Sequence, residues 1–107
     1  MTIEELIVEL KKINQRLLEG YDLDDRRVRI LARTTKISEE VGELANELLA
    51  DLELQRKDKM QYFKSENIAK ELVDVLFTAL ILGITLDIDL EKAIKDRLND
   101  INNRVHI

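Results

Sequence analysis

Four stretches of the chain repeat apolar residues at the spacing of an α-helix, and polar segments separate them. The first begins at Thr2, which can form a capping box with Glu5, and its apolar positions continue to Gly20, a typical C′ residue. The second begins at Asp24 or Asp25, whose carboxylates suit a helix N-terminus, and runs into the low fifties.

Two further helices complete the pattern. Ser65 is expected to cap the third, which ends at Gly83, and Asp89 to cap the fourth, whose last apolar position is Val105. Residues 55–64 are polar and break the period, so they form a loop or a frayed helix end. Four helices with short connections predict an all-α fold, a four-helix bundle.

The third helix carries a polar stripe on an otherwise apolar cylinder. At about 100° per residue, four polar side chains share one side of it: Asn67, Glu71, Asp74 and Thr78. One turn later the polar stripe stops, and Ile81 and Leu82 make the helix apolar on every side; such a helix lies inside a protein. Unpaired charge is expensive in that position, so Glu71 and Asp74 need cations.

The second helix has an apolar stripe beside an acidic one. Its apolar stripe consists of Ile37, Val41, Leu44, Leu48 and Leu52. Its polar stripe consists of Lys36, Glu40, Glu43 and Glu47, with Glu39 one turn before Glu43. If the second and third helices pack antiparallel, carboxylates from both converge across one groove. The alternative is that the Glu-rich face is merely solvated.

Composition limits the class of protein. The 107 residues suit a single domain spanning 1–107, and the chain contains no Pro, so a many-stranded β fold is disfavoured. The absence of Cys excludes disulfides and thiolate metal sites. A net charge of −5 argues against nucleic-acid binding, and the longest apolar run, residues 75–84, is too short to span a membrane. The acidic amino terminus does not resemble a signal peptide, so we expect a cytoplasmic protein.

The carboxylates favour a hard divalent cation. Lys36 and Lys70 are within reach by spacing, but two lysines cannot balance four or five carboxylates. Oxygen ligands without Cys or His select Mg²⁺, or Mn²⁺ in its place, over zinc. A di-iron bundle would need Glu-x-x-His pairs, and the one histidine, His106, is next to last. Substrate phosphates usually complete a Mg²⁺ site, which points to phosphoryl chemistry.

The fourth helix adds groups that together could clamp a polyphosphate. These cations and amides are Lys92, Lys95, Arg97, Asn99, Asn102, Asn103 and Arg104. Singly, each of them is an ordinary surface residue.

The acidic residues occur in an order that resembles a known enzyme signature. Glu39-Glu40-x-x-Glu43, a spacer of 27 residues, and then Glu71-x-x-Asp74 resembles the signature of the MazG-like nucleoside triphosphate pyrophosphohydrolases. These enzymes belong to the all-α NTP pyrophosphatase superfamily. The resemblance covers about residues 30–105. It implies hydrolysis of a nucleoside triphosphate between the α and β phosphates, giving a monophosphate and pyrophosphate, with a house-cleaning role in the nucleotide pool.

The resemblance also implies roles for individual residues. The implied Mg²⁺ ligands are Glu40, Glu43, Glu71 and Asp74. The implied catalytic residues are Glu39 and Glu40, with Glu39 orienting or deprotonating the attacking water. The implied substrate-binding residues are Lys36, Lys95, Arg97, Asn102 and Arg104.

The sequence also allows other functions and favours an assembly of several copies. Within the same fold, the alternatives are a phosphoribosyl-ATP pyrophosphohydrolase and a dUTPase-like enzyme. From a different class, the alternative is a non-catalytic helical module whose acidic face binds a basic partner. A chain of this size cannot easily cover a helix that is apolar on every side, so we expect a homodimer or homotetramer, as in the MazG-like family.

Overall fold

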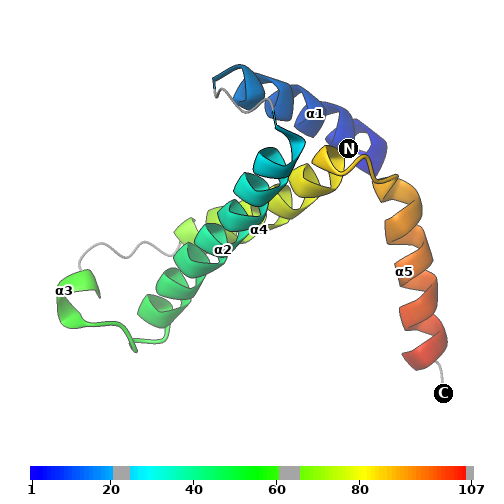
Figure 1. Cartoon of the computed structure of the whole chain (residues 1–107). Helices are drawn as coiled ribbons and strands as arrows, with labels where there is room; N and C mark the ends of the chain where they lie inside the picture. The colour runs from blue at the N-terminus through cyan, green and yellow to red at the C-terminus, as the bar shows by residue number, and fades with distance from the viewer. Residues whose placement is uncertain (21–24, 61–65, 106–107) are drawn as a thin grey trace.

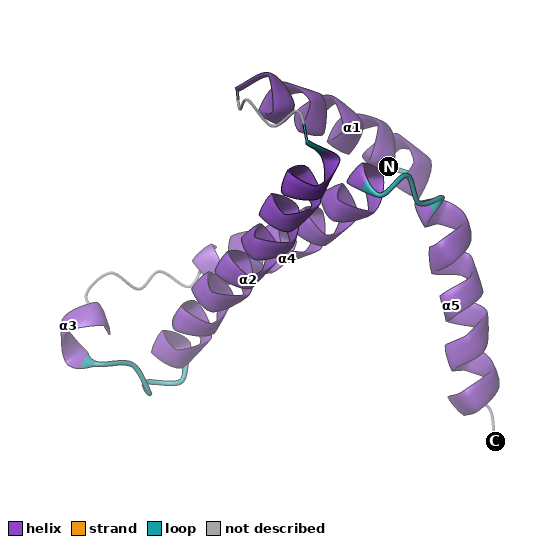
Figure 2. Ribbon diagram, viewed as in Figure 1, coloured by secondary structure: helices purple, strands orange, loops and turns teal. Residues whose placement is uncertain are grey.

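The computed structural model describes residues 1–20, 25–60 and 66–105, and over these residues it shows helices and no strand (Figures 1 and 2). Four long helices carry most of the chain: α1 (Ile3–Gly20), α2 (Arg26–Asp51), α4 (Glu66–Thr85) and α5 (Leu90–Val105). The predicted all-α fold class is therefore confirmed.

One further helix lies in the stretch expected to be a loop or a frayed helix end. It is α3 (Lys57–Met60), a single turn with no buried residue. Ser65, the predicted cap of the next helix, lies outside the described residues.

The long helices are arranged around one antiparallel pair. α2 and α4 lie side by side along most of their length, and α1 crosses the end of the pair where α2 begins and α4 ends (Figure 1). α5 starts from that same end of α4 and extends away from α2 (Figure 2). A single copy therefore does not close a bundle of four helices.

The predicted starts of α1 and α2 are confirmed. The Glu5 amide donates to Thr2 Oγ1 at 3.1 Å, and Thr2 Oγ1 donates back to the Glu5 carboxylate at 3.2 Å, which is the capping box. Asp25 caps α2, because its Oδ1 accepts from the Arg27 amide at 2.9 Å. Asp24, the other candidate for this cap, lies outside the described residues.

The end of α4 differs from the prediction. The helix continues through Gly83 to Thr85, because Gly83 does not adopt the left-handed conformation that ends a helix. Asp87 adopts it instead, with φ 58°. The Ile88 amide then donates to the Gly83 carbonyl, and the Asp87 amide to the Ile84 carbonyl, both at 3.0 Å. This is a Schellman ending.

Gly83 has a packing role at the junction with α5. A Cβ at this position would lie 2.6 Å from Leu90 Cδ2, so glycine is what lets Leu90 pack closely on α4. Asp89 caps α5 as predicted, accepting from the Lys92 amide at 3.1 Å. Gly20 is the last residue of α1 and likewise has no positive φ, so the predicted C′ role is wrong for it.

The apolar core lies where α1 crosses α4. Its buried centre consists of Leu10, which is 1% exposed, Leu80 and Ile81. Partly buried residues surround it: Leu6, Ile7, Ile13, Phe77, Ile84, Leu90 and Ile94. Asn14 of α1 is buried beside it and accepts from Arg33 of α2 at 3.0 Å. The core thus joins α1, the carboxyl half of α4 and the first two turns of α5.

In the amino half of α4 the pattern of burial is reversed, with a charged residue buried and apolar residues exposed. Glu71 is buried, whereas Leu72 and Leu76 are 57% and 51% exposed. The apolar stripe of α2 behaves alike, since Val41 and Leu48 are exposed while Glu40 is buried. In one copy, therefore, α4 is covered as predicted only over its carboxyl half.

The molecule is also extended for its length. Its radius of gyration is 16.9 Å, whereas a compact chain of this size would have about 13 Å. Among the described residues, no helix combines the length and the hydropathy needed to cross a membrane. The cytoplasmic location stays a prediction.

Candidate metal centre

Three carboxylates converge midway along the α2–α4 pair. Glu40 and Glu43 project from α2 and Glu71 from α4, and one oxygen of each lies within 4.8 Å of the other two. Helical spacing puts Glu40 and Glu43 on one face of α2, and the antiparallel packing of α4 puts Glu71 opposite them. The structure thus brings together three of the four metal ligands implied by the sequence.

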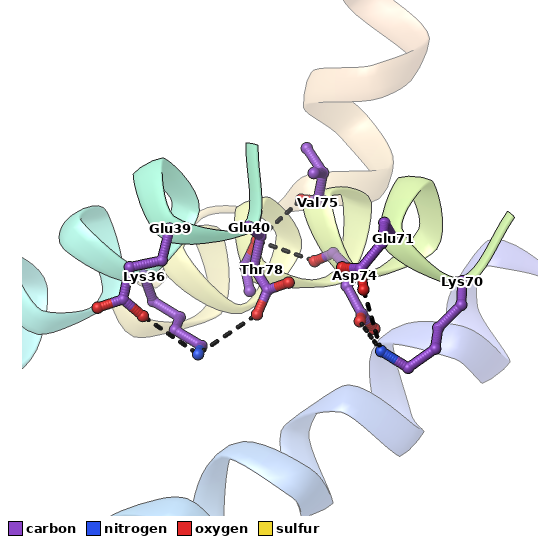
Figure 3. Close-up of polar contacts among 8 residues, drawn as sticks. All are labelled: Lys36, Glu39, Glu40, Lys70, Glu71, Asp74, Val75 and Thr78. Carbon is purple, nitrogen blue, oxygen red and sulfur yellow. Dashed lines mark hydrogen bonds and ion pairs between the residues drawn. The ribbon is translucent and has the colours of Figure 1, made fainter. Parts of the chain in front are cut away.

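Each of the two buried carboxylates has one oxygen beside a lysine and one without a partner. Lys36 Nζ lies 3.3 Å from Glu40 Oε1, and Lys70 Nζ lies 3.4 Å from Glu71 Oε1 (Figure 3). The Oε2 atoms of Glu40 and Glu71 are buried and have no hydrogen-bond partner in the described part of the chain. An unsatisfied buried acceptor costs about 1–3 kcal/mol, and more if it is charged, so a cation between these atoms would be stabilising.

Charge crowding changes the proton affinity of the exposed member of the cluster. The negative charge of Glu40 raises the pKa of the Glu43 carboxyl, with burial and Glu71 adding to the effect. The pKa values of the two lysines are raised as well, which for an amine favours the charged form. The hydrogen bond to Glu39 raises the pKa of Lys36, and the one to Asp74 raises the pKa of Lys70, so both stay charged.

Two further carboxylates lie outside the group of three. Lys70 Nζ holds Asp74 at 3.1 Å, and Lys36 Nζ holds the exposed Glu39 at 3.2 Å (Figure 3). The two lysines therefore bracket the cluster, one from each helix. Among the residues that the structure describes, these five carboxylates face two lysines, an excess of three negative charges.

The predicted substrate-binding residues are not gathered in one place. Lys36 lies at the cluster, whereas Lys95, Arg97, Asn102 and Arg104 are exposed on α5. Lys95 is paired with Glu91 of its own helix at 3.1 Å. α5 extends away from the two helices that carry the carboxylates (Figure 1), so one copy does not bring these groups to its own cluster.

Two residues at the centre have no role implied by the resemblance. The sequence indicates Lys70 only as a cation within reach, although its spacing of one turn from Asp74 is the signal for its ion pair. Glu47 continues the stripe of Glu40 and Glu43 by one more turn, and its Oε2 is buried without a hydrogen-bond partner in the described part of the chain. The spacing of Glu47, four residues after Glu43 and on the same face of the helix, was the sequence signal that places it near the cluster.

The donor set fits a hard divalent cation. All three converging ligand atoms are carboxylate oxygens, which suit Mg²⁺ or Mn²⁺. Oxygens on opposite sides of Mg²⁺ lie about 4.2 Å apart, from bond lengths of about 2.1 Å. The three oxygens all lie within 4.8 Å of one another, so at most a small movement of side chains brings them to this span, and the exposed Glu43 can make it.

An all-helical fold with a carboxylate cluster between two antiparallel helices agrees with the class of the all-α NTP pyrophosphatases. The sequence model of phosphoribosyl-ATP pyrophosphohydrolase, a family of this class, matches residues 3–100, so the chain belongs to that family. Comparisons with curated proteins and with solved structures find no match. The resemblance to MazG-like enzymes thus holds for the superfamily, and the family implies a pyrophosphohydrolase.

Proposed function

We propose that this protein is a Mg²⁺-dependent phosphoribosyl-ATP pyrophosphohydrolase. It would cleave the bond between the α and β phosphates, releasing phosphoribosyl-AMP and pyrophosphate. The observation that carries the proposal is the group of three carboxylates within 4.8 Å, two of them buried with an unpartnered oxygen, in a chain of this family.

The carboxylates supply the cation site. Glu40, Glu43 and Glu71 would hold the ion, with Asp74 able to join them if Lys70 releases it. Bound Mg²⁺ neutralises phosphate oxygens and lowers the pKa of water. Burial of Glu40 and Glu71 fixes their side chains before substrate arrives, so little reorganisation is needed during the reaction.

The two lysines supply positive charge beside the same site. Lys36 and Lys70 are largely exposed and each spans two carboxylates. When a cation occupies the cluster, these ammonium groups become available to the polyphosphate. Within the described part of the chain, Glu39 reaches the cluster through its ion pair with Lys36, so we assign it the orientation of that lysine, and its role as a general base stays a prediction.

We also propose that the active form contains a second copy of the chain. The exposed apolar side chains on α2 and α4, among them Val41, Leu48, Leu72 and Leu76, form faces that a soluble monomer rarely leaves open. The extended shape agrees with a chain that completes its core by association.

Nucleoside triphosphates are the second candidate substrates. The order Glu39-Glu40-x-x-Glu43 and Glu71-x-x-Asp74 resembles the MazG-like signature, and the same cluster could act on any triphosphate chain. dUTP belongs to this group of candidates.

The test is release of pyrophosphate in the presence of Mg²⁺ from a panel comprising phosphoribosyl-ATP, the standard nucleoside triphosphates and dUTP. We expect phosphoribosyl-ATP to be the best substrate. Glu71→Gln should lower the rate at least about 100-fold, as expected for loss of a group that positions charge stabilisation. Glu9→Gln is the matched control, because Glu9 is an exposed helical glutamate paired with Lys12, away from the cluster.

Each outcome has a distinct meaning. Preference for a nucleoside triphosphate would replace the proposed substrate and keep the reaction. No pyrophosphate from any substrate, with no effect of Mg²⁺ on thermal stability, would favour the non-catalytic helical module.

A further inference from the structure

The face of α2 that packs on α4 carries one glutamate more than the group of three carboxylates uses. From residue 34 to the end of α2, the residues that are not exposed are Ile37, Glu40, Leu44, Glu47 and Ala50. Their spacing of three and four residues is that of one face of a helix packed against another element. Glu47 therefore lies at a contact position seven residues after Glu40, although it is outside the group of three.

The position of Glu47 directs its side chain toward the three carboxylates. Glu47 follows Glu43 by four residues and Glu40 by seven, so its direction around the helix axis lies between theirs. Side chains of a helix also lean toward its amino end, which for Glu47 is the end where Glu43 lies. On the antiparallel α4, Asn67 lies one turn before Glu71, so a polar residue continues the site in the same direction on this helix as well.

Glu47 has an acceptor atom that needs a donor. Its Oε2 is buried and has no hydrogen-bond partner in the described part of the chain, like the Oε2 atoms of Glu40 and Glu71. The other oxygens of Glu40 and Glu71 lie beside Lys36 and Lys70. No ion pair of Glu47 is found among the described residues. A buried acceptor without a donor is destabilising, so Glu47 is suited to a donor from outside the chain.

The distance along the helix favours contact through water over a direct bond to the ion. Glu47 lies four residues beyond Glu43, which is about 6 Å along the helix axis. A carboxylate oxygen bound directly to Mg²⁺ lies about 2.1 Å from it. A water molecule between the two adds a hydrogen bond of about 2.6 Å and extends the reach of the carboxylate to nearly about 5 Å. Mg²⁺ usually keeps several waters, and these waters are hydrogen-bond donors.

We propose that Glu47 is a positioning residue of the metal centre, which accepts a hydrogen bond from a water molecule of the bound Mg²⁺, while Glu40, Glu43 and Glu71 bind the ion directly. The inference rests on the proposed function for the presence of the ion, and it adds a residue to which the resemblance gives no role. Groups that hydrogen-bond to the surroundings of a metal in this way typically change its affinity about 10- to 100-fold.

Calorimetric titration of Mg²⁺ into the metal-free protein tests this role without substrate. Glu47→Gln should weaken binding about 10-fold, and Glu47→Leu, which removes the acceptor, about 100-fold. Glu47→Asp keeps the charge but withdraws the oxygens by one carbon–carbon bond, so it should weaken binding as Glu47→Gln does. Asp51→Asn is the matched control, because it removes the same charge from an exposed position of α2 and should leave the affinity unchanged.

Thermal melts separate this role from a contribution to folding. In the metal-free protein, Glu47→Leu should melt at or above the wild type, because a buried acceptor without a donor is removed. On addition of Mg²⁺ the wild type should gain more than the variant, because it binds the ion more tightly. A variant that melts below the wild type by the same amount with and without Mg²⁺ would assign Glu47 a structural role and overturn the inference.

The outcomes distinguish the inference from the proposed function. Equal Mg²⁺ affinity in the wild type and the Glu47 variants would overturn the inference and leave the function intact. A loss that Asp51→Asn matches, or that is absent in Glu47→Asp, would reduce the effect of Glu47 to its charge and also overturn the inference. A wild type that binds no Mg²⁺ would overturn both. A wild type that binds Mg²⁺ more tightly than the Glu47 variants but releases no pyrophosphate would count against the proposed function alone.

Discussion

The two halves of α4 differ in which side chains they bury: the carboxyl half buries apolar residues, and the amino half buries a carboxylate. The carboxyl half buries Leu80 and Ile81 against Leu10 of α1. The amino half turns Glu71 toward Glu40 of α2 and leaves its leucines in solvent. The apolar side chains of the carboxyl half are buried within one chain. In the amino half, by contrast, the carboxylates that face α2 outnumber the nearby lysines, and the leucines on the opposite face are exposed.

Along α4, the carboxyl half therefore contributes to stability, and the amino half carries the candidate functional site. Apolar burial of the kind seen around Leu10 contributes about 25 cal/mol per Å² and needs nothing outside the chain. Like charges at close range destabilise the metal-free protein until a cation neutralises them. The amino half of α4 should therefore respond to metal and pH, while the carboxyl half should not.

The largest effect is expected from a substitution in the apolar core around the carboxyl half of α4. Leu10→Ala leaves a cavity beside Leu80 and Ile81 and should lower the free energy of unfolding by about 2–5 kcal/mol. Urea denaturation followed by circular dichroism measures it. Val8→Ala is the control, because Val8 lies on the same helix but is about half exposed. Equal losses in both variants would contradict the placement of the core.

The next largest effect concerns the amino half of α4 and its response to Mg²⁺. Mg²⁺ should stabilise the wild-type protein by about 2.7 kcal/mol at a hundredfold excess over its dissociation constant, which raises the melting temperature. Sodium chloride at matched ionic strength is the control. In Glu71→Gln the gain from Mg²⁺ should vanish, and the metal-free variant should melt above the metal-free wild type, because one repelling charge is gone.

The smallest effect is expected from titrating the exposed carboxylate. Glu40 raises the pKa of Glu43 above its usual 4.5 in the folded protein. The folded state therefore binds the proton more tightly than the unfolded state. Its contribution to stability is full below pH 4.5 and is lost as the pH rises through the raised pKa.

Thermal melts of metal-free wild type and Glu43→Gln over this range measure the difference. The variant should be more stable at pH 7, and its advantage should shrink as the pH falls toward 4.5. Glu9→Gln is the control, because it makes the same chemical change on the exposed face of α1, away from the cluster. An advantage of Glu43→Gln that grows on acidification would show that Glu43 is not crowded by its neighbours.

Local rules predicted much of this fold. The caps at Thr2, Asp25 and Asp89 follow from side chains that bond to amides two or three residues away, and all three are present. The prediction that Gly83 ends α4 is wrong, because this glycine allows close packing against Leu90. That contact depends on where α5 begins, which no local pattern contains.

Local helical spacing also predicted part of the candidate site, but not the contacts that depend on side-chain geometry. Helical spacing placed Glu40 with Glu43, and antiparallel packing then brought Glu71 opposite them. Spacing could not show that Asp74 is held by Lys70 outside the group of three, because only side-chain geometry decides between the two partners. Nor could it show the direction of α5, which separates Arg97 and Arg104 from the carboxylates of their own chain.

The short connection between α4 and α5 has a consequence for how the chain tolerates insertions and deletions. One residue added between Thr85 and Leu90 would disrupt the hydrogen bonds that fix this connection, from the Asp87 and Ile88 amides to α4, and would displace Leu90 and Ile94 from the core. An insertion of the same length near α3 would disturb no buried side chain of that helix. Length variation among natural or engineered versions should therefore concentrate in the α2–α4 connection and spare the residues between Thr85 and Leu90.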